Sequence, residues 1–232
     1  MASKRNIVDE VVSRRARHLK RVPRLAQSDK RLLALEAAHS SLVAHTAIPL
    51  PLRKEFYRHV PVALIAISEG YCRMLYGEII DNGEPFLSRI RELKSLKLDV
   101  GDLIATSSRK ISIGELISHQ LPHNKLSDIE DNLGLLLGED FGFEFTKRLE
   151  REDAKIGGIV FQSHLRRLII ETFRLRHILC HELAPKIALR QYEMGTLIKV
   201  FRVFLHMLDD HVKEATKRAQ QAAASDGEKP PI

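Results

Sequence analysis

Apolar residues that recur every three or four positions are the feature that most limits what this chain can fold into. Such spacing places side chains on one face of an α-helix, and that face must be buried against another element. One stripe, in the first half of the chain, consists of Leu64, Ile67, Tyr71, Leu75 and Ile79. Another, near the end, consists of Leu189, Tyr192, Leu197, Val200, Phe201, Phe204 and Leu208. These stripes predict an all-α fold.

Glycine and proline set the expected limits of the long helices. We predict core helices over residues 52–81, 155–176 and 187–218. Asn82-Gly83 is a turn signal at the end of the first, and Pro185 separates the second from the third. Between about residues 85 and 150 the pattern is choppier. We therefore expect a helical bundle with short irregular helices inserted between its core helices.

Three local features refine this picture. Helical spacing also runs through "DKRLLALEAAHSSLVAH", for which Ser28 and Asp29 are candidate N-caps. Pro61 is expected to begin or to kink the helix that contains it. Residues 96–113 contain β-branched side chains, which leaves a short hairpin open as an alternative there.

The excess positive charge lies at the N-terminus. The chain has 37 Lys and Arg against 30 Asp and Glu. Residues 1–31 hold ten of the basic and three of the acidic residues, so the rest of the chain holds 27 of each sign. We divide the chain into a basic arm (1–27), a helical domain (28–218) and a disordered tail (219–232). Basic arms often follow phosphate backbones, although a solvated leader has the same composition.

Several classes of protein are disfavoured by what the sequence lacks. No apolar run approaches the roughly 20 residues of a membrane span, and the N-terminus has no apolar core of a secretory signal. The two cysteines, Cys72 and Cys180, are far apart and form no C-x-x-C, so we expect a reduced, cytoplasmic location and no structural zinc site. Nucleotide-binding glycine motifs and the G-x-S-x-G elbow are also missing, and no cofactor is expected.

The segment "RLRHILCHELAPK", from Arg174 to Lys186, carries the candidate chemistry. His181 follows Arg176 with four residues between them, and His177 lies four residues before His181. The two histidines share one helical face if the helix continues that far. Three interpretations are open: a basic surface at a helix end, a pair of transition-metal ligands beside Cys180 or Glu182, and a catalytic group. For the metal site, the sequence identifies no third ligand.

"FRLRHILCHELA" resembles the motif of the HEPN family (higher eukaryotes and prokaryotes nucleotide-binding), most closely of members that accompany bacterial defence and toxin systems. The family motif is Arg, a polar residue, and then His four to six residues after the Arg. Here the polar position is His177, where many members have Asn or Asp. "VALIAISEGYCRMLYGEI" resembles an early core helix of the family with an acidic residue, Glu69. The resemblance spans about residues 40–212.

The resemblance implies a HEPN-like helical bundle that acts as a metal-independent endoribonuclease. It implies a homodimer whose two motifs face each other across one cleft, RNA as substrate, and an antitoxin or sensor subunit as a further candidate partner. His181 would be the general acid or base, Arg176 the phosphate-binding and transition-state-stabilising group, and His177 a supporting polar group. RNA supplies its own nucleophile, the 2′-hydroxyl, and histidine and arginine suit proton transfer and phosphate binding.

A second function class remains open at this point. A helical nucleic-acid- or protein-binding module would use the basic arm and catalyse no reaction.

Glu69 either pairs with Arg176 or faces solvent. In the proposed dimer, Ile178 and Leu179 are expected to be buried against the partner chain.

Overall fold

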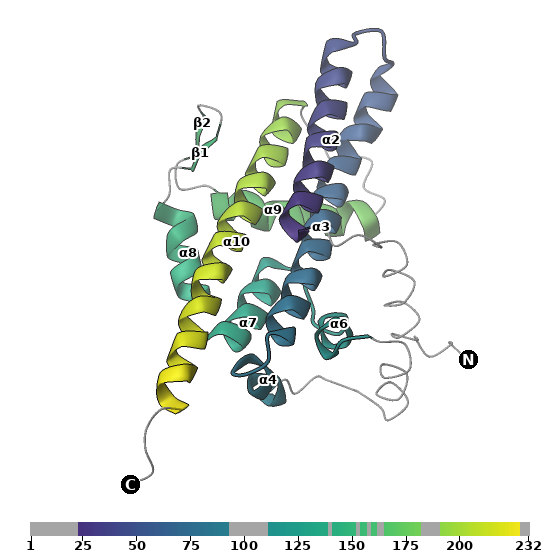
Figure 1. Cartoon of the computed structure of the whole chain (residues 1–232). Helices are drawn as coiled ribbons and strands as arrows, with labels where there is room; N and C mark the ends of the chain where they lie inside the picture. The colour runs from purple at the N-terminus through teal and green to yellow at the C-terminus, as the bar shows by residue number, and fades with distance from the viewer. Residues whose placement is uncertain are drawn as a thin grey trace, which may run out of the picture.

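The computed structural model describes residues 23–92, 111–138, 141–151, 154–156, 159–161, 165–181 and 191–227 (Figure 1). Its helices are α2 (Arg24–Ala44), α3 (Leu50–Asp81), α4 (Phe86–Arg89), the 3-10 helix η1 (Ile90–Glu92), α6 (Ile113–Ser118), α7 (Leu126–Leu137), α8 (Phe141–Arg151), α9 (Leu165–His181) and α10 (Gln191–Gly227). Strands β1 (Ala154–Ile156) and β2 (Ile159–Phe161) form a small antiparallel pair. The all-α class is confirmed.

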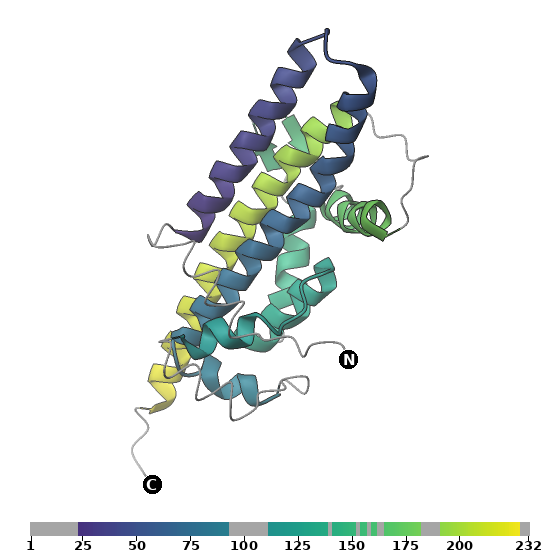
Figure 2. The ribbon, with the colours of Figure 1, turned by 90° about the vertical axis from the view of Figure 1, so that its right-hand side faces the viewer.

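Three long helices, α2, α3 and α10, run side by side along the molecule (Figures 1 and 2). Helix α9 lies across α3 and α10, so that Figure 2 views it nearly end-on. Helices α7 and α8 pack against the lower half of α10. Among the described residues, no helix combines the length and the apolar composition that crossing a membrane would require.

The apolar stripes of the sequence form the core. All five members of the first stripe are buried on α3, with Leu64 and Tyr71 fully inaccessible. On α10, Leu197, Val200, Phe201, Phe204 and Leu208 are buried as predicted. Pro61 does not begin the helix that contains it, because α3 begins at Leu50, after Pro49, and Pro61 lies inside it. Proline suits the start of a helix, so Pro49 and Pro51 are the true start signal.

The predicted N-caps of the preceding helix are wrong. Helix α2 begins at Arg24, directly after Pro23, so residues 24–27 belong to a helix and not to the basic arm. The Ser28 hydroxyl lies inside the helix and donates to the Arg24 carbonyl at 3.1 Å, a bond that serine can make within a helix. Asp29 contacts Nε2 of His206 on α10, at 2.9 Å. Residues 1–22 lie outside the described part.

The limits of the two last core helices also differ from the prediction. The second begins at Leu165 and not at 155, because "IVF", with two β-branched residues, forms β2 and pairs with residues 154–156. Helix α10 continues to Gly227, so residues 219–227 are helical and not a disordered tail. Its last turns contain three consecutive alanines, the strongest helix formers. Most of the proposed hairpin over residues 96–113 lies outside the described residues, and its last residue, Ile113, begins α6.

A buried ionic cluster joins the three long helices. The carboxylate of Asp209 on α10 accepts hydrogen bonds from the Tyr71 hydroxyl at 2.8 Å, and it pairs with Arg24 at 2.8 Å and Lys213 at 2.6 Å. Burial by itself would raise the pKa of Asp209, but the hydrogen bonds from Lys213 and Tyr71 and the Arg24 charge lower it. The cluster fixes the register of α2, α3 and α10, because a buried carboxylate without its partners is costly.

Helices α3 and α6 approach closely at two glycines. A Cβ on Gly114 would collide with the carbonyl oxygen of Gly77, so no larger residue fits there without moving a helix. The backbone N–H of Gly114 donates to Asp81 at 2.9 Å. Ser112 caps α6 by accepting from Glu115 N–H while the Glu115 carboxylate accepts from Ser112 N–H. This contact brings the residues after α6 against α3.

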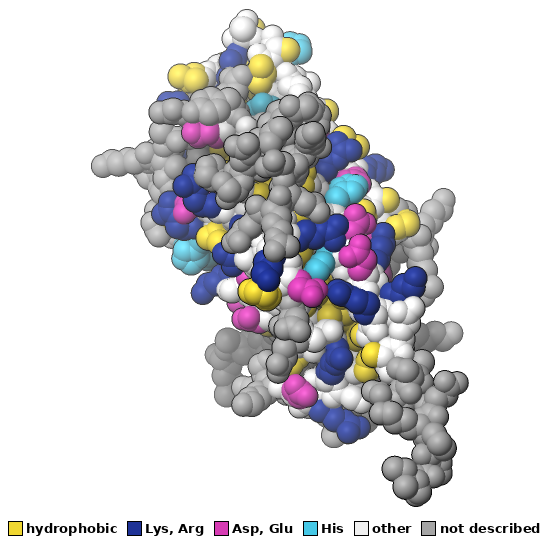
Figure 3. Space-filling view, turned by 90° about the vertical axis from the view of Figure 1, so that its left-hand side faces the viewer, with side chains coloured by type: hydrophobic (Ala, Val, Ile, Leu, Met, Phe, Trp, Pro, Cys, Tyr) yellow, Lys and Arg dark blue, Asp and Glu magenta, His cyan; other side chains and the backbone are white. Residues whose placement is uncertain are grey.

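Charged side chains of both signs are interspersed on the face that holds α8 and α10 (Figure 3). Arg148 lies 3.5 Å from Glu214, and Arg218 lies 3.2 Å from Glu144. Exposed pairs of this kind contribute only about 0–1 kcal/mol each. The face shows no concentration of one sign among the described residues, which agrees with the even charge balance beyond the first 31 residues.

A buried histidine should make the fold sensitive to mild acid. His211 packs between Phe141 and Phe145 on α8, and its Nε2 is buried without a hydrogen-bond partner. Burial lowers the pKa of His211, and the charge of Arg148 acts in the same direction. The unfolded chain takes up the proton near pH 6.5, whereas the folded chain takes it up only at lower pH. The stability that the neutral ring contributes is therefore present above about pH 6.5 and is lost as the pH falls toward the folded pKa.

We predict that His211→Leu flattens the fall in the free energy of unfolding between about pH 7 and pH 5. Urea unfolding at several pH values measures this. His45→Leu, at an exposed position, is the control and should keep the wild-type slope. An unchanged pH dependence in His211→Leu would contradict the assignment.

Candidate functional site

Helix α9 carries the three residues that the sequence singled out. It buries Leu165, Ile169, Thr172 and Phe173. The Thr172 hydroxyl donates to the Leu168 carbonyl at 2.7 Å, which satisfies a buried polar group. Because one face is packed on α3 and α10, the other side chains of the helix have fixed directions. Arg176, His177 and His181 all fall within the helix, which continues past the predicted end at residue 176.

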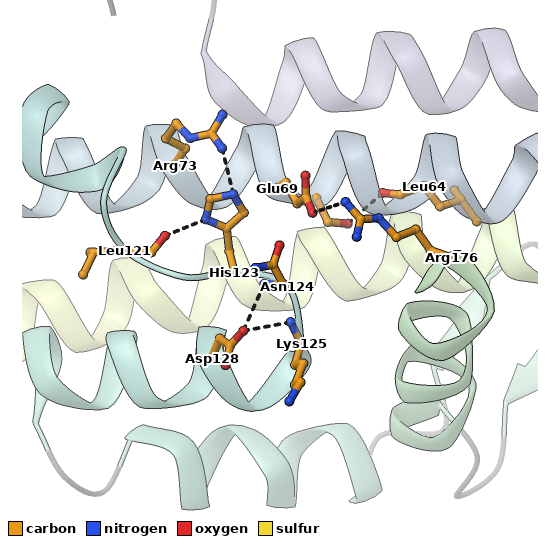
Figure 4. Close-up of polar contacts among 10 residues, drawn as sticks. Leu64, Glu69, Arg73, Leu121, His123, Asn124, Lys125, Asp128 and Arg176 are labelled. Atoms are coloured by element: carbon orange, nitrogen blue, oxygen red, sulfur yellow. Dashed lines mark hydrogen bonds and ion pairs between the residues drawn. The ribbon is translucent and has the colours of Figure 1, made fainter. Parts of the chain in front are cut away.

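Arg176 points toward α3. Its Nη2 lies 3.4 Å from Oε1 of Glu69, and both side chains are partly buried (Figure 4). The sequence left open whether Glu69 pairs with Arg176 or faces solvent, and the pair is formed. The distance is long for a hydrogen bond with two charged partners. The carboxylate of Glu69 is nevertheless close enough to orient the guanidinium of Arg176 toward α3.

His177 and His181 lie together on the exposed face of α9. Their ring centroids are 4.8 Å apart, with the ring planes tilted by 48°. Both residues are exposed to solvent. The prediction that they share one face is confirmed, because α9 continues to His181. Two imidazoles are thus presented side by side near the C-terminal end of the helix.

The guanidinium and the second imidazole do not face the same way. Successive residues turn by about 100° around a helix axis, so Arg176 and His181 differ in direction by about 140°. Arg176 is directed to α3 by Glu69, whereas His181 is exposed. One chain therefore presents the two histidines as a pair and the arginine on an adjacent face.

A second polar pair lies next to Glu69 on α3. Nη2 of Arg73 lies 2.7 Å from Nε2 of the buried His123, and Nδ1 of His123 lies 2.8 Å from the Leu121 carbonyl (Figure 4). Guanidinium can only donate, so Nε2 must accept and Nδ1 must carry the proton. His123 is therefore neutral, in one defined tautomer.

The residues around His123 are held by α7. The Asn132 amide donates to the Pro122 carbonyl at 2.6 Å. The carboxylate of Asp128 accepts from the backbone N–H groups of Asn124 and Lys125 at 3.0 and 3.1 Å. This is an acidic residue in the first turn of a helix, satisfying N–H groups that the helix leaves without partners. These contacts hold the segment that carries His123 independently of Arg73.

Glu69, Arg73, His123 and Arg176 form one polar surface between α9 and the start of α7 (Figure 4). Gly70 lies between the two α3 residues, and a Cβ added there would meet nothing within 4 Å. The surface is therefore open above α3. It offers two guanidiniums, whose forked donors match phosphate oxygens.

Sequence reasoning did not single out Arg73 or His123. The spacing of Glu69 and Arg73, four residues apart on one helix, places them on the same face and was the available signal. His123 carries no such signal, because it reaches Arg73 only through the packing of α6 and α7 on α3.

Metal binding and cysteine reactivity are two further kinds of chemistry that the residues of this chain could support. Within the described ranges, no three His, Cys, Asp or Glu residues converge as a metal site. Cys180 is exposed and free, and Glu182 lies outside the described residues. Cys72 is buried, and burial raises its pKa to about 12, so it remains a thiol and is no nucleophile.

No family model, curated protein or solved structure matches this chain. We therefore infer the function from the residues of the site and their geometry.

The tautomer of His123 is directly testable. We predict a neutral ring with the proton on Nδ1 at neutral pH, because Arg73 can only donate to Nε2. Long-range ¹⁵N–¹H spectra of ring-labelled protein distinguish the two tautomers. Arg73→Met should release Nε2 and give a mixture of tautomers, while Arg58→Met, on the same helix, should not. A ring protonated on Nε2 in the wild type would refute the arrangement.

Proposed function

We propose that this chain is a metal-independent endoribonuclease of HEPN type, acting through Arg176, His177 and His181. The observation that carries the proposal is the pair of exposed imidazoles, 4.8 Å apart, directly after an arginine held by Glu69. The three residues supply two imidazoles, a group that can accept and donate protons, and a permanent cation.

The reaction follows from the chemistry of RNA. A base removes the proton of a 2′-hydroxyl, and the oxygen attacks the adjacent phosphorus. The bond from phosphorus to the 5′-oxygen breaks, and an acid protonates that oxygen, leaving a 2′,3′-cyclic phosphate and a 5′-hydroxyl. We assign His181 as one of these proton-transfer groups and His177 as the polar group that supports it. Arg176 stabilises the negative charge that builds on the phosphate oxygens.

The divergent directions of Arg176 and His181 support a homodimer. One chain cannot easily place both groups on one phosphate, since they differ by about 140° around α9. A twofold axis sets the same surface against itself and can bring the arginine of one copy toward the histidines of the other. Ile178 and Leu179, the expected contact residues, are half-buried within the chain, whereas Ile170 is an exposed apolar residue of α9. We propose Ile170 as the apolar contribution of α9 to the dimer.

The cellular setting rests on the resemblance alone. It places the chain in a bacterial defence or toxin system, in the cytoplasm, with an antitoxin or sensor subunit as a regulatory partner. The competing proposal is a non-catalytic module that binds nucleic acid or protein. The concentration of positive charge in residues 1–31 favours it, because binding alone would use such an arm.

We predict that the purified chain cleaves RNA in the presence of EDTA and that His181→Ala lowers the rate by about 100-fold or more, as loss of a general acid or base does. The matched control is His45→Ala, an exposed histidine at the turn between α2 and α3, which should cleave normally. Gel analysis of a labelled RNA, with detection of the cyclic phosphate end, measures both. RNA binding without cleavage anywhere between about pH 6 and pH 8 would favour the non-catalytic module.

We also predict that Glu69 positions Arg176. Glu69→Ala should lower kcat by about 10-fold, because the freed guanidinium samples other rotamers and small misplacement is costly. Glu69→Gln should retain more activity, since its amide oxygen can still accept from Arg176. Glu55→Ala is the control: it removes an exposed glutamate that pairs with Arg58 on the same helix. Equal rates for Glu69→Ala and Glu55→Ala would show that Glu69 has no positioning role.

A further inference from the structure

The exposed histidine pair of α9 has the geometry of a chelating site. A metal–nitrogen bond measures about 2.0–2.1 Å, and a ring centre lies about 1.1 Å beyond the nitrogen, so two imidazoles on one tetrahedral ion have centres about 5 Å apart. The centroids of His177 and His181 are 4.8 Å apart before any ion is bound. The separation of the two rings therefore already matches that of two ligands on one ion.

We propose that His177 and His181 bind a divalent transition-metal ion of the Zn²⁺ class and that the bound ion blocks both rings. Imidazole suits zinc, copper and nickel, whereas magnesium and calcium prefer oxygen ligands. No third ligand converges among the described residues, so water completes the coordination. The metal site itself does not depend on the proposed ribonuclease activity; its inhibitory effect on cleavage does.

The helix holds the two ligands ready. The opposite face of α9 is packed through Ile169 and Phe173, and Arg176 is tied to Glu69. The two histidines therefore stand about one turn apart on a helix whose position is fixed. After one ring binds the ion, the other encounters it at a high effective concentration. Two ligands of ordinary strength then bind far more tightly than either alone.

The local charges permit a cation at this position. Arg174 and Arg176 flank the histidines, but Arg174 pairs with Glu171 at 2.9 Å and Arg176 pairs with Glu69. Their positive charges are thus offset by carboxylates. His181 also lies in the last turn of α9, where the partial negative charge of the helix favours cations. Exposure of both rings means that the ion keeps much of its hydration.

Another pair with the same spacing shows why spacing alone is insufficient. His119 and His123 are also four residues apart. Both ring nitrogens of His123 are already engaged, one with Arg73 and one with the Leu121 carbonyl, and the ring is buried. Such a ring cannot coordinate an ion without losing both contacts. Within the described residues, His177 and His181 are the pair at this spacing in which both rings are exposed.

The test is zinc binding by the full chain, measured by calorimetry with ZnCl₂ in a non-chelating buffer without RNA. We expect one ion per chain, and a loss of about 100-fold in affinity in His177→Ala and in His181→Ala, since either change removes the chelate. His119→Ala and Cys180→Ser should bind as the wild type does. MgCl₂ should give no signal. Wild-type affinity in both alanine variants would overturn the proposal, and so would loss of binding in Cys180→Ser, which would indicate a thiolate site.

A second readout tests whether the ion blocks the rings. Zinc should protect His177 and His181 from acylation by diethylpyrocarbonate, with protection reversed by EDTA, while His45 should react equally with and without zinc. Equal modification of the pair in both conditions would overturn the block. Neither readout uses RNA, so their failure is distinguishable from failure of the ribonuclease proposal. In a chain that cleaves RNA, the same zinc concentration should inhibit cleavage, and EDTA should restore it.

Discussion

Burial of α3 on most of its sides is the constraint on which the rest of the structure depends. Helices α2, α6, α9 and α10 all pack on it, and its apolar side chains fill the centre of the core. The strip that its neighbours leave partly uncovered runs through Ala66, Glu69, Gly70 and Arg73. Polar groups on a core helix lie either on such a strip or beside a buried partner, as Tyr71 does with Asp209, because a buried polar group without a partner is costly. The position of the polar surface therefore follows from the packing.

The sequence could predict features that depend on local spacing, but not contacts between distant parts of the chain. The α3 and α10 stripes followed from helical spacing, and so did the shared face of His177 and His181. These are local consequences of 3.6 residues per turn. The Arg73–His123 contact joins residues 50 positions apart and depends on how α6 meets α3 at Gly77 and Gly114. No local pattern encodes such a meeting.

The errors at helix ends have a similar cause. A prediction from apolar spacing could not distinguish "IVF" as a strand from the start of α9, because a short apolar run is compatible with either element. Ser28 looked like a cap because its side chain bonds to backbone in either setting. At the other end, alanines extended α10 although they contribute no apolar stripe. The HEPN assignment and the catalytic roles of Arg176 and His181 stay predictions, because they concern a reaction that the positions of these side chains do not test.

Helix α9 directs the three side chains of the motif to two different faces. Residue spacing sets Arg176 against α3, where Glu69 holds it, and sets the two histidines on the outer face. Proton transfer and metal binding both require the lone pair of an imidazole nitrogen, so the two uses of His177 and His181 exclude each other. His123 lies outside this competition because its nitrogens are occupied by Arg73 and Leu121. Exposure, and not the presence of histidine, is what makes the α9 pair available to both a substrate and an ion.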